Sequence, residues 1–291
     1  MTVTATAPVA APPRHRRRWI WITVALVTAV LVVLALLAVT VAVAFRRQQN
    51  VPVTFRRPIT MLRLGTPDAA VTVAPGPPGL VRVERFLTWR LGPPPQVTTA
   101  WSGRTLQVTV PGCSSTPLRW CSAQVVIQVP AGTALRASAG AGNLAVSALT
   151  GPLHVRLTSG MVSLNGVSGP VWARATSGMI SASGLSAARV DAAVSSGNLS
   201  LQFAAPPQRV SALATSGIIA VTVPPGARYR VLGSAPAGVW GVVPGLVSRT
   251  SPRLITAAAT TGSVSVGYGP GFPPAPAGHP AQRVSPAPLG S

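Results

Sequence analysis

The stretch TSGMVSLNGVSGPVWARATSGMISA, residues 158–182, contains the tetrapeptide Thr-Ser-Gly-Met twice, about 18 residues apart. A small residue followed by glycine and then by alternating apolar residues returns about every 18 to 20 residues through the second half of the chain. The glycines of this motif are Gly142, Gly160, Gly178, Gly197, Gly217 and Gly262. Self-similarity at such a period is typical of a stacked array of β-strand repeats.

Apolar and small residues alternate after each glycine: the second and fourth residues are apolar, and the residue between them is Ser or Ala. The apolar pairs are Leu144/Val146, Val162/Leu164, Ile180/Ala182, Leu199/Leu201, Ile219/Val221 and Val264/Val266. Because successive side chains of a strand point to opposite faces, each pair is predicted to face inward. A second strand in each copy adds another inward set, such as Val171, Ala173 and Ala175.

One copy of this motif cannot bury its apolar residues alone, whereas stacked copies build a continuous core. We therefore predict an all-β fold, a β-solenoid-like stack of strand repeats over residues 132–268, with an interior filled by side chains. The interval between Gly217 and Gly262 is about twice the usual one. Either a glycine signal has been lost there or the chain makes a longer excursion, and residues 231–247 are expected to hold it.

The segments that flank the repeats differ from them in composition. Residues 46–131 are predicted to form a linker and a strand-rich N-terminal part, in which Pro- and Gly-rich breaks separate the apolar runs. The strands expected there lie at 59–64, 69–74, 80–86, 105–110 and 124–129. Residues 269–291 are rich in Pro, Ala and Gly, which favours an extended, disordered tail.

The apolar run at residues 19–45 contains no charged residue and is about 27 residues long, more than the roughly 20 that cross a bilayer as a helix. Basic residues flank it: Arg14, Arg16, Arg17 and Arg18 before it, Arg46 and Arg47 after it. We predict a single transmembrane helix that acts as an uncleaved signal anchor in the lipid bilayer, preceded by a basic cytoplasmic tail at 1–18. A cleaved signal peptide is the alternative, because residues 42–44 have the small-x-small form of a cleavage site.

Cys113 and Cys121 are the only cysteines and lie close together between strand-like runs. Such a pair suits a disulfide in an oxidising compartment. The predicted topology therefore has a cytoplasmic N-terminus and an extracellular C-terminal domain. A free or metal-binding pair is the alternative, although no nearby histidine completes a zinc site.

The charge balance excludes several function classes. The formal net charge is +21, and all 24 basic residues are arginines, against the carboxylates Asp68, Glu84 and Asp191. Nucleic-acid binding is not expected, because no aromatic stacking platform accompanies the arginines. Glycoside hydrolysis uses paired carboxylates, and only Asp191 lies in the repeats. The sequence therefore predicts a protein that is not an enzyme and has no catalytic residue, metal site or cofactor.

The outward positions of the second strands form two predicted columns. The first contains His154, Trp172, Asp191 and Ser211, and the second contains Arg156, Arg174, Ala193 and Leu213. Trp172 with His154, Arg156 and Arg174 is a candidate binding surface, since aromatic faces and guanidinium groups suit sugar rings and anionic polymers. The alternative is structural: Asp191 pairs with Arg174 or Arg209, and Trp172 packs under a loop.

Several motifs resemble the bacterial putative-adhesin family of β-strand-repeat proteins of unknown function. They are the strand-rich N-terminal part, the run at 125–130, the repeated Thr-Ser-Gly and the closing Thr-Thr-Gly-Ser-Val-Ser-Val at 260–266. The resemblance covers about residues 51–268. Many members of that family carry an acidic residue after the repeated glycine. The corresponding residues here are Asn143, Met161, Met179, Asn198, Ile218 and Ser263, which argues against an acidic or calcium-binding ladder.

The resemblance implies an envelope-exposed β-solenoid, with adhesion as the family's label. We expect a membrane-anchored extracytoplasmic module with an adhesin-like binding or structural role at the bacterial cell envelope. Its expected partners are the lipid bilayer and a cell-wall polymer or another envelope protein. The alternative is envelope-stress sensing, in which residues 1–18 would report inward as a disordered basic segment.

Overall fold

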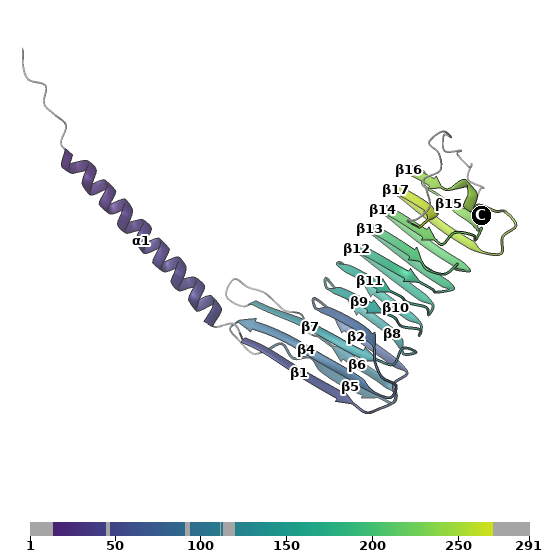
Figure 1. The fold of residues 1–291 in the computed structure, drawn as a ribbon, viewed down its shortest axis with the longest axis horizontal. Coiled ribbons are helices and arrows are strands. Elements are labelled where there is room, and N and C mark those ends of the chain that lie inside the picture. The colour runs from purple at the N-terminus through teal and green to yellow at the C-terminus, as the bar shows by residue number, and fades with distance from the viewer. Residues whose placement is uncertain (1–13, 45–46, 91–93, 111, 113–119, 270–291) are drawn as a thin grey trace, which may run out of the picture. The chain divides into compact units, whose positions relative to one another are not determined.

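The computed structural model describes residues 14–44, 47–90, 94–110, 112 and 120–269 (Figure 1). The chain divides into two compact units, Met1–Arg47 and Gln48–Ser291. The first unit contains one helix and the second contains nearly all of the strands.

Helix α1 (Arg14–Ala44) has 31 residues. The backbone of Arg14 and Arg16 to Arg18 lies in its first turns, Arg47 begins the strand that follows, and Arg46 lies outside the described residues. Thr28 donates a hydrogen bond from its hydroxyl to the carbonyl oxygen of Val24 at 2.9 Å, which satisfies the side chain within the helix. In the part of the chain that the structure describes, no helix combines the length and the apolar character that crossing a membrane requires.

The second unit is built from strands that belong to a single 17-stranded sheet. The strands before the repeats are β1 (Arg47–Phe55), β2 (Met61–Thr66), β3 (Ala70–Pro75), β4 (Val81–Arg90), β5 (Thr98–Ser102), β6 (Thr105–Thr109) and β7 (Trp120–Val129). The strands of the repeats are β8 (Ala134–Ala139), β9 (Asn143–Ser147), β10 (Leu153–Leu157), β11 (Met161–Asn165), β12 (Val171–Leu185), β13 (Arg189–Phe203), β14 (Arg209–Val223), β15 (Arg230–Ser234), β16 (Ala237–Val242) and β17 (Leu254–Tyr268). A short 3₁₀ helix, η1 (Pro244–Leu246), lies between the last two.

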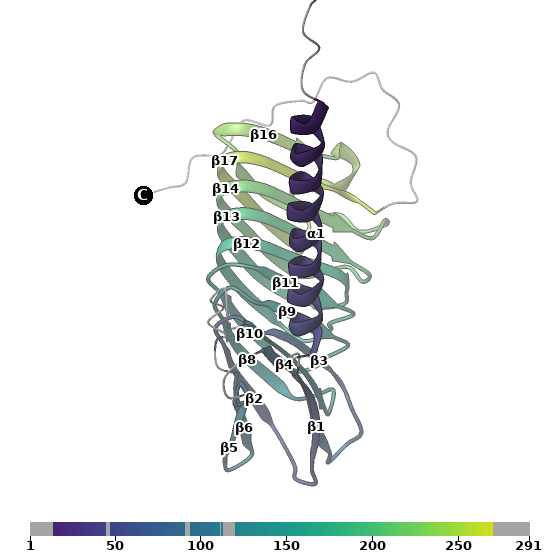
Figure 2. The same cartoon turned by 90° about the vertical axis from the view of Figure 1, so that its left-hand side faces the viewer.

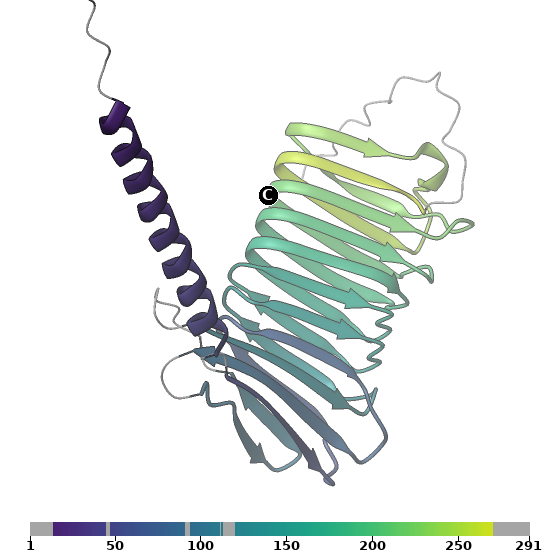
Figure 3. The same cartoon turned by 60° about the vertical axis from the view of Figure 1, so that its left-hand side comes forward.

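Strands of successive copies pair in parallel and in register. Leu153 of β10 pairs with Val171 of β12, which pairs with Val190 of β13, which pairs with Val210 of β14. All of the apolar pairs predicted to face inward are buried, and they share one hydrophobic core with the inward residues of the neighbouring strands. Figure 3 shows the strands of the copies one above another. The expected body of repeated β-strands is confirmed, whereas its winding as a solenoid stays a prediction.

The repeated glycine marks a place where adjacent copies approach too closely for any side chain. A Cβ atom built on Gly197 would overlap the carbonyl oxygen of Gly178, and one built on Gly217 would overlap that of Gly197. Gly197 also has a φ of +136°, a conformation that other residues rarely adopt. In β12, β13, β14 and β17 the strand runs on through this glycine, so the motif there is a bend within one strand. In the other copies the chain forms two strands, as in β15 and β16.

The long interval after Gly217 contains a complete copy whose position is exchanged with that of the last one. β17 pairs in parallel with β14 on one side and with β15 and β16 on the other. Gly238 of β16 pairs with Gly262. It takes the place of the repeated glycine in this copy, although it was not recognised from the sequence pattern. The last copy in the sequence is therefore the second to last in space, as Figure 2 shows with β17 between β14 and β16.

A similar exchange occurs at the N-terminal end of the stack. β2 pairs in parallel with β8 on one side and with β6 on the other, and β3 does the same with β9 and β7. β4 and β5 are antiparallel to β7 and β6. The parallel stack thus extends from residues 132–268 into the N-terminal part, where five strands were expected and where β1 and β5 were not.

Candidate functional site

The strands β8, β10, β12, β13 and β14 carry five arginines and one aspartate at outward positions. The register places His154, Trp172, Asp191 and Ser211 in one column and Arg156, Arg174, Ala193 and Leu213 in the next, as the sequence predicts. The structure extends the two columns to Arg136 and Ser138 of β8. Arg189 and Arg209 pair with each other two residues before the first column. We call the surface formed by Arg136, Arg156, Arg174, Arg189 and Arg209, together with Trp172, the arginine face.

Trp172 lies at the centre of this face and is half-buried. Its ring stacks on His154, with centroids 5.6 Å apart and an interplanar angle of 30°. The guanidinium groups of Arg156 and Arg174 lie 5.1 and 4.8 Å from the centre of the indole ring. Cation–π contacts of this kind hold the two charges close to the ring. The four residues predicted as a binding surface are therefore brought together.

Arg174 also pairs with the carboxylate of Asp191. Its Nη1 donates to Oδ1 at 3.1 Å and its Nη2 donates to Oδ2 at 2.9 Å. The side chains remain 33% and 42% exposed, so the pair stabilises the fold by no more than about 1 kcal/mol. Of the two partners considered for Asp191, Arg174 is the one the structure selects.

Most of the positive charge on this face has no counter-charge in the protein. The described residues contain two ion pairs, Arg82–Glu84 and Arg174–Asp191. Arg136, Arg156, Arg189 and Arg209 therefore have no carboxylate partner within that part of the chain. The face carries five arginines and one carboxylate, and its excess charge is available to an anion.

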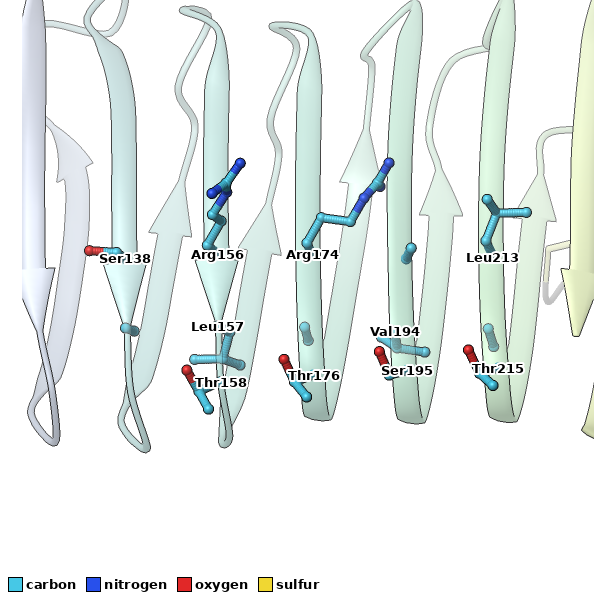
Figure 4. A pocket seen from close by; sticks show the side chains of 14 residues that line it. Ser138, Arg156, Leu157, Thr158, Arg174, Thr176, Val194, Ser195, Leu213 and Thr215 are labelled. Atoms are coloured by element: carbon cyan, nitrogen blue, oxygen red, sulfur yellow. The ribbon is translucent and has the colours of Figure 1, made fainter. Parts of the chain in front are cut away.

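Two shallow grooves flank the central residues. The first has a volume of about 490 Å³ and is lined by Arg156, Arg174 and a row of hydroxyl-bearing residues from successive strands, Thr158, Thr176, Ser195 and Thr215. Figure 4 shows these hydroxyl groups in a row beside the two arginines. Arginine and hydroxyl groups are all hydrogen-bond donors, so this groove suits an acceptor-rich ligand.

The second groove has a volume of about 400 Å³ and lies on the other side of Trp172. Its lining includes His154, Trp172, Asp191, Arg189 and Arg209. Two prolines, Pro152 and Pro170, form part of its apolar wall. The two grooves together present arginines along one face from β10 to β14.

The strands after the repeated glycine present a different surface. Their outward residues Ala145, Ser163, Ser181, Ser200, Ala220 and Ser265 are small, and the sequences of β9, β11 and β16 contain no charged residue. From β8 to β14 the charge therefore lies on the arginine face, and the other arginines of the repeats, Arg228, Arg230, Arg249 and Arg253, belong to the last copies. This contrast identifies the face as the candidate site.

Sequence reasoning missed part of this site. Arg136, Arg189 and Arg209 were not recognised as members, although their spacing from the inward valines and leucines places them outward. The hydroxyl row was also missed, because Thr and Ser of the repeated motif were assigned to turns. The disulfide proposed for Cys113 and Cys121 stays a prediction: Cys121 packs against the core in β7, and Cys113 lies outside the described residues.

Comparison with solved structures finds bacterial proteins of low sequence identity. A putative cell adhesion protein from Clostridium sporogenes is 13% identical, with a TM-score of 0.42, and the match covers 77% of this chain and 100% of that one. A putative adhesin from Parabacteroides distasonis is 14% identical, with a TM-score of 0.42 and coverage of 76% and 97%. A putative adhesin from Bacteroides fragilis is 13% identical, with a TM-score of 0.32 and the same coverage.

No protein-family model and no curated protein sequence matches the chain. The TM-scores of the solved structures lie below 0.5, so no residue or activity is transferred from them. These three structures are described as a putative cell adhesion protein and two putative adhesins. The sequence motifs of this chain resemble the putative-adhesin family.

Proposed function

We propose that this protein is a membrane-anchored, extracytoplasmic binding module of the bacterial cell envelope, with an adhesin-like role and no catalytic activity. In this proposal α1 is the anchor and the repeats form a β-solenoid that presents the arginine face to a cell-wall polymer or another envelope component. The observation that carries the proposal is the arginine face itself, where neighbouring strands present five arginines together with one tryptophan and one carboxylate.

The solenoid is supported by the register of the parallel strands. Position by position, β12 pairs with β13, and β13 with β14, over both halves of each copy. In a solenoid, each repeat contacts only its neighbours along one axis. Successive copies of about 19 residues that pair in the same register fit this arrangement.

The membrane anchor is supported by the apolar run at 19–45 and by the exposure of its side chains. Leu31, Leu34 and Val24 are each about half exposed in α1, which belongs to a unit separate from the repeats. Exposed apolar side chains along a helix need an apolar environment, and a bilayer supplies one. The flanking arginines suit anionic headgroups at its surface.

A binding role in place of catalysis is supported by the state of Asp191. It is the one carboxylate in the repeats, and both of its oxygens accept hydrogen bonds from Arg174. Glycoside hydrolysis uses a pair of carboxylates, whereas the repeats contain this single one, which Arg174 already engages.

The proposal is tested by cosedimentation of the full-length protein, in neutral detergent, with isolated bacterial cell walls. We expect the protein to sediment with the walls and the double variant Arg156→Ala/Arg189→Ala to remain largely in the supernatant. Arg104→Ala is the matched control, because Arg104 lies in the turn between β5 and β6 and lines neither groove. If the double variant sediments as well as the unmodified protein, the arginine face is not the binding surface.

The anchor is tested separately by expressing the full-length protein in bacteria and extracting the membrane fraction with carbonate. An integral protein stays in the pellet. Release of the protein into the carbonate supernatant would contradict the proposed anchor, and it would leave the binding proposal unaffected.

A further inference from the structure

The surroundings of Trp172 indicate what kind of ligand the arginine face takes. A tryptophan that binds sugars needs an open ring face, but this ring already contacts His154 and two guanidinium groups. Its described contacts are with the protein's own cations and with an imidazole. Trp172 therefore holds Arg156 and Arg174 in place, and the groups available to a ligand are charges and hydroxyls.

The cations of the face are arranged along the stack of strands. Arg136, Arg156 and Arg174 lie on β8, β10 and β12, and Arg189 and Arg209 lie on β13 and β14. Neighbouring strands are about 4.8 Å apart, so five successive strands extend over roughly 19 Å. A small anion would contact one or two of these residues, whereas a linear polymer laid across the strands can reach all of them.

Asp191 occupies the position that one anionic group of such a polymer would take. Its carboxylate fills the two-donor fork of Arg174, in the middle of the row of arginines. Guanidinium groups bind carboxylates and phosphates in the same bidentate geometry. Because the pair is partly exposed and weak, an external anion can displace the carboxylate.

We propose, on the basis of the function proposed above, that the arginine face binds a linear polyanion across β8 to β14, and that Asp191 competes with the polymer's anionic groups for Arg174. The anionic groups are carboxylates or phosphodiesters. Trp172 is a positioning residue, which acts through the two arginines that its ring holds. Asp191 thereby limits the affinity of the site.

The proposal predicts opposite effects for the two partners of the ion pair. Asp191→Asn removes the competing charge while keeping the size of the side chain, so we expect polyanion binding about three- to tenfold tighter. Arg174→Ala removes one cation, so we expect binding about three- to tenfold weaker and a smaller dependence on salt. In the double variant the substitution of Asp191 is expected to have less effect, because its partner is gone.

The experiment measures fluorescence anisotropy of labelled polymers with the full-length protein in neutral detergent, between about 50 and 200 mM salt. The probes are polygalacturonate, poly(glycerol phosphate) and uncharged dextran, with thermal unfolding of each variant as a check on folding. Trp172→Leu is expected to weaken polyanion binding, and Trp172→Phe to retain most of it because a phenyl ring still attracts guanidinium groups. The two anionic probes distinguish carboxylate from phosphodiester.

Equal binding of dextran and the polyanions, or weaker polyanion binding by Asp191→Asn with unchanged thermal stability, would overturn this inference. Tighter binding to vesicles of anionic phospholipid than to either polymer would also overturn it. Sedimentation with cell walls but no binding of either polyanion would reject the ligand class and leave the binding role standing. Failure in both assays would reject both proposals.

Discussion

Arg174 reaches Asp191 diagonally across two neighbouring strands. In the register of the sheet Asp191 lies opposite Trp172, and Arg174 lies opposite Ala193, yet the Nη2–Oδ2 distance between the two charged groups is 2.9 Å. The guanidinium group thus contacts the indole ring of its own strand and the carboxylate of the next one at the same time. This shared position couples Trp172 and Asp191 through one arginine.

The close packing between adjacent copies is predicted to be most sensitive to substitution at the stacked glycines. Gly197→Ala should lower the melting temperature strongly, because the new Cβ would overlap the backbone of Gly178. Gly226→Ala is the control: Gly226 also has a positive φ, +88°, but no atom lies within 4 Å of a Cβ there. Gly226→Ala should lower the free energy of unfolding by only about 1–2 kcal/mol, the cost of placing alanine in the left-handed conformation. Equal melting temperatures of the two variants would show that close packing between copies does not require glycine.

Substitutions at two adjacent residues of β11 test which side chains face the core and which face the solvent. Val162→Asp places a charge without a partner in the core and should cost several kcal/mol, since Val162 is fully buried. Ser163→Asp adds the same charge on the exposed side and should leave the melting temperature within a few degrees of that of the unmodified protein. Thermal unfolding followed by circular dichroism decides this, and a similar loss in both variants would contradict the faces.

Tyr229 is predicted to destabilise the protein through its hydroxyl group. The side chain is fully buried, and its hydroxyl oxygen has no hydrogen-bond partner among the described residues. Tyr229→Phe keeps the ring and removes the buried polar atom, so it should be neutral or should stabilise the protein by about 1 kcal/mol. Chemical unfolding of the two proteins at neutral pH measures this, and a large loss of stability would reveal a partner for the hydroxyl.

The same tyrosine predicts a loss of stability in alkali. Burial raises the pKa of Tyr229, an effect that nearby Arg253 partly offsets and Tyr268 reinforces. The folded state disfavours the ionised form of Tyr229. The stability that comes from this pKa difference is therefore fully present below the ordinary tyrosine pKa of about 10, and it is lost as the pH rises through the higher pKa of the folded state. Unfolding measured from pH 8 to 11 should show a steeper decline for the unmodified protein than for Tyr229→Phe. Parallel curves would contradict the assignment.

The disulfide predicted from the sequence has a direct chemical test. Mass spectrometry of protein exported by bacteria and digested without reduction should find the peptides of Cys113 and Cys121 joined. Alkylation of both thiols in exported protein before reduction would remove this proposal.

The regular part of the fold could be predicted because its signals are local. Alternation after Gly178 and Gly197 fixes which side chains of β12 and β13 face the core, and the common period fixes which residues become neighbours. The exchange of β17 with β15 and β16 could not be predicted, because any copy carries the apolar pattern needed to pair with any other. Gly238 was hidden for a related reason: it follows Ala237 where the other copies mostly have Ser or Thr, and a tryptophan occupies the next inward position.

The candidate site could be predicted only in part. The period placed Arg156 and Trp172 on neighbouring strands, since that requires nothing beyond counting residues. The partner of Asp191 depends on the direction of a long, flexible side chain, so Arg174 and Arg209 were equally acceptable from the sequence. The role of Trp172 also depended on geometry, because only the structure shows that its ring is already in contact with cations.

Because the order of the last copies is exchanged, the copy before β17 in the sequence depends on β17 for its strand pairing. β15 and β16 leave the ribosome before β17, but the strand that they pair with in parallel is β17 itself. A premature stop before Leu254 would therefore remove one copy and leave a second, already synthesised, without its neighbour. The edges of β15 and β16 that pair with β17 would then be exposed, so the stability of the C-terminal end of the stack depends on complete translation.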